Sequence, residues 1–151
     1  MAILIAVPLL AAAPPPVEAE ANRHVAERVF LEKMGQGRFD RLEEIYAPGF
    51  VAHGPTGDSS LAEDNASGQE WRRAFPDLKV TVARTAVDGD LVAVHWHAAG
   101  TNSVAAAGLP GKGGAMSIDG MTFFRFAQGR IAEEWSLIDM ATMLAQLGGK
   151  P

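Results

Sequence analysis

A lone carboxylate near the C-terminus, Asp139, has the setting that most favours acid–base chemistry. Its neighbours along the chain are mostly apolar, and they are Trp135, Leu137, Ile138 and Met140. Burial among such side chains disfavours the charged form of a carboxyl group, so we expect a raised pKa and a role as general acid or base. The same position, just before a predicted helix, also suits an N-cap residue, and the two roles are compatible.

Two basic side chains are candidates to assist such a carboxylate. Arg125 lies on a predicted strand, where alternation gives it the same face as Met121 and Phe123. We expect this face to point inward, where the guanidinium could stabilise a negative charge that develops during a reaction. The alternative is an ion pair between Arg125 and Glu133 across a hairpin. His53 ends a short predicted strand. We expect it near the mouth of a pocket between the helices and the sheet, where it either takes part in proton transfer or is bonded to the backbone.

His95 and His97 lie two residues apart on one strand face, a spacing that could serve a metal site together with a carboxylate. A histidine pair on an exposed sheet face or in a dimer interface is the more common arrangement, so we expect no metal. The chain has no cysteine. This excludes disulfides, thiolate zinc sites and cysteine nucleophiles.

Large apolar side chains would form the core, and some of them should line a pocket for an apolar ligand. A planar ring packs well against aromatic faces. The candidates for ligand contacts are Trp71, Phe75, Trp96, Met121, Phe123 and Trp135.

The pattern of apolar residues predicts helices first and strands afterwards. Helices are expected over 22–34, 40–46, 60–75 (interrupted near Gly68) and 140–147, and strands over 50–53, 78–87, 91–101, 116–126 and 131–136. Asp88-Gly89 and Gln128-Gly129 are hairpin turn signals, and Gly120 suggests a bulge or bend. Capping boxes are expected at Asp40/Glu43 and Ser67/Glu70, and residues 103–114 as a loop. This order is the α+β pattern, in which helices on one face of a bent sheet enclose a pocket.

Composition limits the classes of partner. The chain has 151 residues and a net charge of −5 without a cluster of Lys or Arg. One domain is therefore expected, and nucleic acid is not expected as a partner, because phosphate binding needs a basic surface.

The N-terminal segment differs from the rest of the chain. Residues 1–13 are almost wholly apolar and three prolines follow, a run too short to span a bilayer. We interpret it as a signal peptide with Ala19-Glu20-Ala21 as the cleavage pattern, although no Lys or Arg precedes it. Residues 1–21 would then be removed, leaving a domain over 22–151 that is secreted or periplasmic, without a stable membrane anchor. The alternative is a cytoplasmic protein with a short apolar helix.

A series of short motifs runs in order from about Asn22 onward. They are Gly37-Arg38-Phe39-Asp40, 46–51, His53-Gly54-Pro55, Phe75-Pro76-Asp77, 90–96, 120–126, Gly129-Arg130-Ile131 and Gln146-Leu147-Gly148. Their order and spacing resemble the SnoaL-like polyketide and ester cyclases of the nuclear-transport-factor-2-like superfamily. Two positions depart from the family pattern: Asn102 follows Gly100-Thr101 where histidine is common, and Arg125 stands near a histidine of some cyclases.

The resemblance implies a cone-shaped α+β fold, a homodimer formed through the sheet, and ring closure or isomerisation of a carbonyl compound by acid–base side chains without cofactor or metal. It also implies that Asp139 is the acid–base aspartate, since it follows the Trp of the last strand by four residues. Arg125 is a permanent cation and cannot shuttle protons near neutral pH. Two alternatives stay open: a non-catalytic binding module with the same pocket, and an epoxide hydrolase, for which no convincing second aspartate is found.

Overall fold

The structure is a computed structural model that describes residues 16–55 and 57–148. Its elements are α1 (Pro16–Arg28), η1 (Val29–Met34), η2 (Leu42–Glu44), β1 (Tyr46–Gly54), β2 (Gly57–Ser60), α2 (Leu61–Ala74), β3 (Lys79–Asp88), β4 (Leu91–Asn102), β5 (Ala105–Ala106), β6 (Leu109–Pro110), β7 (Gly114–Ala127), β8 (Arg130–Ile138) and α3 (Met140–Gln146). This order confirms the expected α+β organisation. The apolar segment 1–13 of the predicted signal peptide lies outside the described residues.

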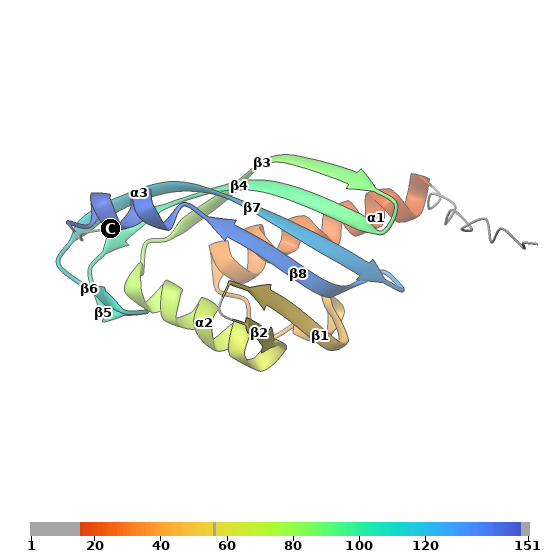
Figure 1. Ribbon diagram of the computed structural model, residues 1–151, viewed down its shortest axis with the longest axis horizontal. Helices are drawn as coiled ribbons and strands as arrows, with labels where there is room; N and C mark the ends of the chain where they lie inside the picture. Colours follow the sequence, from red (N-terminus) through yellow and green to blue (C-terminus); the bar gives the residue numbers. More distant parts are fainter. Residues whose placement is uncertain (1–15, 56, 149–151) are drawn as a thin grey trace, which may run out of the picture.

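Six strands form one curved, open sheet, and α1 and α2 lie against the same face of it (Figure 1). The strand order is β2-β1-β8-β7-β4-β3. Neighbouring strands run antiparallel except β1 and β8, which pair in parallel. The hairpins β3–β4 and β7–β8 turn where the sequence predicted, at Gly89 and at Gln128-Gly129, and these residues have positive φ.

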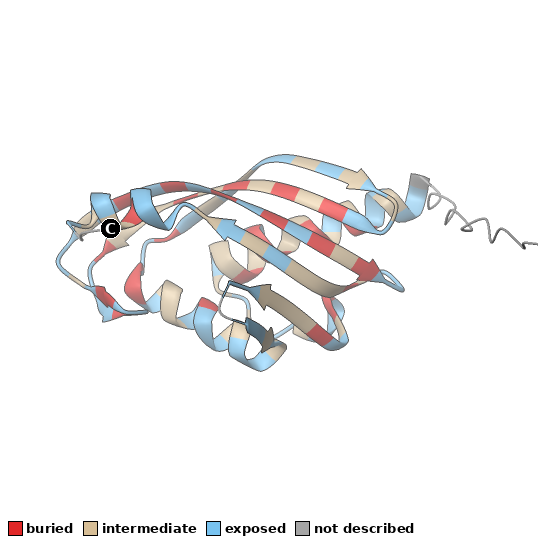
Figure 2. Ribbon diagram, in the orientation of Figure 1, coloured by how far each residue is buried: buried red, intermediate tan, exposed pale blue. Residues whose placement is uncertain are grey.

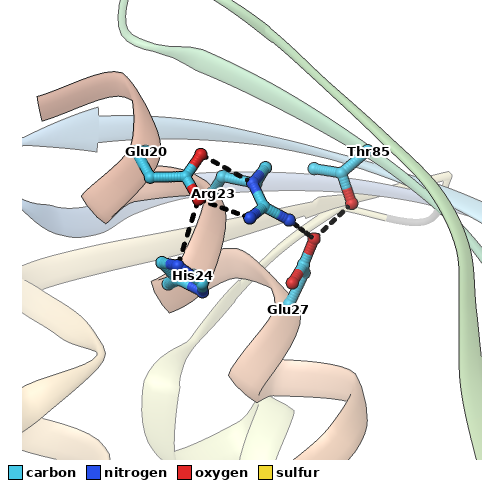
Figure 3. A network of polar contacts seen from close by, with 5 residues as sticks. All are labelled: Glu20, Arg23, His24, Glu27 and Thr85. Carbon is cyan, nitrogen blue, oxygen red and sulfur yellow. Dashed lines mark hydrogen bonds and ion pairs between the residues drawn. The ribbon is translucent and has the colours of Figure 1, made fainter. Parts of the chain in front are cut away.

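The first helix begins earlier than predicted, at Pro16 instead of Asn22. A network of ion pairs runs along it and reaches the sheet (Figure 3). Arg23 bonds to Glu20 and Glu27, and Glu27 Oε1 also accepts the hydroxyl of Thr85 on β3 at 2.9 Å. These contacts fix α1 over β3. Cleavage before Asn22 would remove Glu20 and the first turns of this helix.

Two sequence predictions around the next helices were wrong. Residues 40–46 form only the short 3₁₀ turn η2, because Tyr46 already pairs with Ile131 of β8 and belongs to the sheet. The capping box of α2 is formed by Ser60 and Glu63 instead of Ser67 and Glu70, and α2 runs through Gly68 without a break. Both serines are followed by a glutamate three residues later, so the local motif alone did not decide where the helix starts.

Burial alternates along the central strands, which separates the two faces of the sheet (Figure 2). Val92, Val94, Trp96 and Ala98 of β4 are buried on the face that carries the helices. On β7 the corresponding residues are Met116, Ile118, Thr122, Phe124 and Phe126. Gly120 is also on this face, and the residues that alternate with these positions face outward.

Gly120 is not a bulge, because β4 and β7 pair without interruption at Trp96 and Gly120. The glycine is required by the indole of Trp96, which lies against it: a Cβ at position 120 would come within 2.1 Å of Trp96 Cζ2. The irregularity of β7 lies instead between Arg125 and Phe126, in its pairing with β8.

The segment expected as a loop, 103–114, contains the small hairpin β5–β6, whose Ala106 and Leu109 are buried. Asn102 holds this hairpin: its buried amide donates to the carbonyls of Ala74 and Val104 and accepts the N–H of Gly111. In the described part of the chain, no helix has the length and apolar character needed to cross a membrane.

Candidate active site

A cavity of about 160 Å³ lies between the helices and the inner face of the sheet. Most of its wall is apolar and is formed by Val29, Phe30, Met34, Gly68, Trp71, Leu78, Val80, Trp96, Ala98 and Ile138. The polar lining residues are Lys33, Asp64, Ser67, Thr122, Glu134 and Ser136. An apolar cavity with a few polar groups is the usual form of a small-molecule site.

Lys33 brings a buried positive charge to the cavity wall. Its side chain is 3 % exposed, although it belongs to η1 and lies among apolar residues. The ammonium group donates to Asp64 Oδ2 at 2.5 Å and to Tyr46 Oη at 2.9 Å. A buried charge is tolerated when it is paired and hydrogen-bonded, and both conditions are met here. Burial raises the pKa of Tyr46 well above its usual range, so its phenol stays protonated.

Glu134 brings a carboxyl group that can change its charge near neutral pH. Desolvation is the main cause that raises the pKa of Glu134 to about 7. The Asp64 carboxylate acts in the same direction, whereas Lys33 and a hydrogen bond from Ser136 oppose it. Glu134 retains some accessible surface and lines the cavity. A carboxyl group with such a pKa is suited to take up and return a proton at physiological pH.

A chain of hydrogen bonds holds Glu134 in place. Ser136 Oγ donates to Glu134 Oε1 at 2.8 Å and lies 2.8 Å from Thr122 Oγ1. The indole N–H of Trp96 donates to the same Thr122 oxygen at 3.1 Å. Since Trp96 donates to Thr122, the Thr122 hydroxyl can donate to Ser136, and Ser136 to the carboxylate. The base and one aromatic wall of the cavity are therefore fixed together.

These groups supply what proton transfer next to a carbonyl needs. Glu134 can act as the base, and Lys33 is a fixed cation near the place where negative charge would develop. Asp64 holds the ammonium group of Lys33 and compensates its charge. In the apolar surroundings of the cavity these electrostatic interactions are stronger than they would be in water.

Comparison with known proteins agrees with this architecture. The family model of the SnoaL-like polyketide cyclases matches residues 24–147. The chain belongs to this family. IdmH from Streptomyces antibioticus, a proposed polyketide cyclase, is 30 % identical with a TM-score of 0.74, over 84 % of this chain and 98 % of that one. No curated protein matches the sequence significantly.

Two further solved structures share the fold at lower identity. A proposed SnoaL-like polyketide cyclase from a Jannaschia species has a TM-score of 0.79 and 20 % identity, over 93 % of this chain and all of that one. AclR from Streptomyces galilaeus, a proposed hydroxylase, has a TM-score of 0.78 and 22 % identity, over 88 % and 99 % of the two chains. They confirm the expected SnoaL-like fold, with its sheet left open.

The predicted acid–base residue of this SnoaL-like chain, Asp139, lies on the surface at the start of α3. Its Oδ1 accepts the backbone N–H of Thr142 at 2.9 Å, which is the N-cap role expected as the alternative. The expectation of a raised pKa was wrong: the hydrogen bonds from Thr142 lower the pKa of Asp139. In the described ranges, the cavity wall does not include Asp139.

Arg125 and His53 also lie outside the cavity, on the outer face of the sheet. Arg125 Nε donates to Glu133 Oε2 at 2.6 Å, so the ion pair across the hairpin is present. The expected inward direction of the face that carries Arg125 was wrong. His53 stacks on Trp135, with ring centroids 4.7 Å apart, and its Nδ1 lies 2.8 Å from Asp58 Oδ1.

The aromatic candidates divide between the two faces of the sheet. Trp71 and Trp96 line the cavity, and Phe75 is fully buried behind Trp71. Three others are exposed on the outer face, which is opposite to the predicted direction: Met121, Phe123 and Trp135. Their exposure follows from strand alternation, because the inner positions of β7 and β8 are taken by Thr122, Phe124, Glu134 and Ser136.

His95 and His97 lie on this outer face too. Each has one ring nitrogen 3.3 Å from Asp119 Oδ1. Among residues 16–55 and 57–148, no group of three or more His, Asp or Glu side chains has a geometry that could hold a metal ion.

Sequence reasoning missed Lys33 and Glu134, although both carried a signal. Lys33 follows Val29 and Phe30 by four and three residues, so it lies on the apolar stripe of the first helix. Glu134 shares its strand face with Ser136 and Ile138. A charged residue on a core-facing stripe is the kind of exception that indicates a functional site.

Proposed function

We propose that this SnoaL-like protein binds an apolar carbonyl compound in the cavity and catalyses an aldol-type cyclisation or an isomerisation by proton transfer at Glu134. The proposal rests mainly on one observation: a carboxyl group with a pKa of about 7 lies in an apolar cavity beside a buried lysine. Relatives described as proposed polyketide cyclases support the reaction class. Such chemistry places the protein among cofactor-independent lyases or isomerases.

The proton transfer would run as follows. The ionised Glu134 carboxylate removes a proton from the carbon next to the carbonyl, and the electron pair of that C–H bond moves into the enolate. The negative charge thus passes from Glu134 to the enolate oxygen, where the Lys33 ammonium group stabilises it. In a cyclisation the enolate carbon attacks a second carbonyl, whose oxygen becomes an alkoxide and takes up the proton. In an isomerisation the enolate is reprotonated at a different carbon. Glu134 returns the proton in either case, so the protein ends unchanged.

A second function is a non-catalytic module that binds an apolar ligand in the same cavity. The tight pairing of Lys33 with Asp64 and Tyr46 favours this alternative, because it also explains a stable buried lysine without catalysis. The two functions differ in whether bound ketone exchanges its protons.

Hydrogen–deuterium exchange at the α carbons of cyclohexanone, followed by NMR in D₂O, tests the proposal. The wild-type protein should exceed the buffer rate. Glu134→Gln should lose roughly 10²–10⁴-fold of the enzymatic rate, because that is the usual contribution of a general base. The matched control is Glu133→Gln, the neighbouring carboxylate on the outer face, which should keep the rate. Exchange no faster than in buffer, with the ketone bound, would leave the binding module as the function.

A further inference from the structure

The size and charge of the cavity restrict the substrate to a narrow class. Resting on the proposed function, we infer that this protein acts on an uncharged carbonyl compound of the size of a single six-membered ring, and not on a fused polycyclic compound or a carboxylate. Three features of the structure support this assignment: the cavity volume, the rigidity of its aromatic walls and the balance of its charges.

The cavity volume is close to that of a single ring. It measures about 160 Å³, and an apolar protein cavity of about 150 Å³ is known to accept benzene. A ketone based on one six-membered ring therefore fits, with its oxygen toward the polar groups. A second fused ring exceeds this volume, so it would have to project from the cavity without being fully enclosed by its walls.

The aromatic wall formed by Trp96 is held on several sides, so this side of the cavity resists widening. The indole of Trp96 lies against Gly120, stacks on Phe30 with ring centroids 5.5 Å apart, and donates to Thr122. Trp71 packs on the fully buried Phe75 at a centroid distance of 5.8 Å. Dense packing of this kind resists expansion.

The charges of the cavity favour an uncharged ligand. Lys33 contributes one positive charge, and Asp64 balances it. When Glu134 is ionised, as the base must be, the cavity carries a net negative charge. A carboxylate ligand would add a second one in an apolar setting, where like charges repel strongly. An uncharged ketone adds none, and proton removal only moves the existing charge from Glu134 to the enolate.

Calorimetric titration of the full-length protein at pH 8 with three probes tests the inference. The probes are cyclohexanone, its bicyclic analogue 2-decalone, and cyclohexanecarboxylate. Cyclohexanone should bind. If 2-decalone could bury its second ring, it would bind roughly a hundredfold more tightly than cyclohexanone; we expect it to bind no more tightly. The carboxylate should bind at least about tenfold more weakly than cyclohexanone.

Two variants with the same substitution separate the cavity from the outer face. Trp71→Leu removes part of the cavity wall and should raise the affinity for 2-decalone by about tenfold or more relative to cyclohexanone. Trp135→Leu makes the same change on the outer face of the sheet and should leave both affinities unchanged.

The inference is overturned if wild-type protein binds 2-decalone much more tightly than cyclohexanone, if it prefers the carboxylate, or if it binds none of the three probes. It is also overturned if Trp71→Leu leaves the preference between the two ketones unchanged. These outcomes are distinct from failure of the proposed function, in which cyclohexanone binds as expected but its α-proton exchange is no faster than in buffer.

Discussion

Replacing Glu134 by glutamine should make the protein more stable at alkaline pH and change its stability little at acid pH. In the folded protein the pKa of Glu134 is raised from 4.5 to about 7. Glutamine keeps the shape of the side chain and an oxygen that can accept the hydrogen bond from Ser136. The variant therefore removes the ionisation and preserves most contacts.

The sign follows from which state holds the proton more tightly. Between pH 4.5 and 7 the unfolded chain releases the proton of Glu134 while the folded protein keeps it, so the free energy of unfolding falls as the pH rises. The interval from 4.5 to about 7 corresponds to roughly 3 kcal/mol, at about 1.4 kcal/mol for each pH unit. Above pH 7 both states are ionised and the difference stays constant.

Urea unfolding of wild type and Glu134→Gln at several pH values between 4 and 8.5 measures this effect. The other titrating groups are common to both proteins, so their contributions largely cancel in the difference. From the lowest to the highest of these pH values, the free energy of unfolding of the variant should rise by roughly 3 kcal/mol relative to that of wild type. For comparison, Glu133→Gln should become less stable relative to wild type as the pH rises, because Arg125 lowers the pKa of Glu133.

A difference between wild type and Glu134→Gln that does not change with pH would show that this carboxyl group is solvated. If the wild type instead became more stable than the variant as the pH rises, the attraction between the Glu134 carboxylate and Lys33 would outweigh the desolvation of the carboxylate. Either result would refute the reasoning that assigns the base to Glu134.

Four further predictions concern activity, the surface and the N-terminus. The rate of α-proton exchange should rise with pH, reach half of its maximum near pH 7 and level off above it, where Glu134 is ionised; a rate without a plateau would argue against it as the base. Asp139→Asn should keep the exchange rate, since asparagine caps a helix as well as aspartate, and a large loss would return the catalytic role to Asp139. Light scattering should give the mass of a homodimer, and Phe123→Glu on the exposed outer face should give that of a monomer. Secreted material should begin near Asn22 by N-terminal sequencing, whereas a chain that keeps Met1 in the cytosol would contradict export.

Local signals predicted the hairpins well, because a two-residue turn with positive φ is encoded by the residues themselves. Asp88-Gly89 and Gln128-Gly129 lie at the turns that they predicted. For the stretch around Tyr46, the helical spacing of Leu42, Ile45 and Tyr46 predicts a helix. Pairing with β8 decided its structure, and no local pattern reveals a parallel partner that is distant in sequence.

The site itself was predicted only in its general form. The order of the elements predicted a pocket between helices and sheet, and the aromatic character of Trp71 and Trp96 predicted their place in its wall. The charged groups inside it come from three separate segments: Lys33 from η1, Asp64 from α2 and Glu134 from β8. The packing of these segments decides which charged residues come together. The apolar residues next to each of them in sequence do not predict these contacts.

Asp139 and Glu134 show why apolar neighbours in sequence are a poor guide to desolvation. Asp139 follows Trp135 and Leu137, but both side chains point to the outer face and leave the start of α3 open to water. Its carboxylate is therefore stabilised by hydrogen bonds, and its pKa falls. In the sequence, Glu134 lies between the charged Glu133 and the exposed Trp135. Strand alternation nevertheless points its side chain into the cavity, where desolvation raises its pKa. The direction of the side chain relative to the sheet, and not the hydrophobicity of the adjacent residues, decides which of the two carboxyl groups can serve as a base near neutral pH.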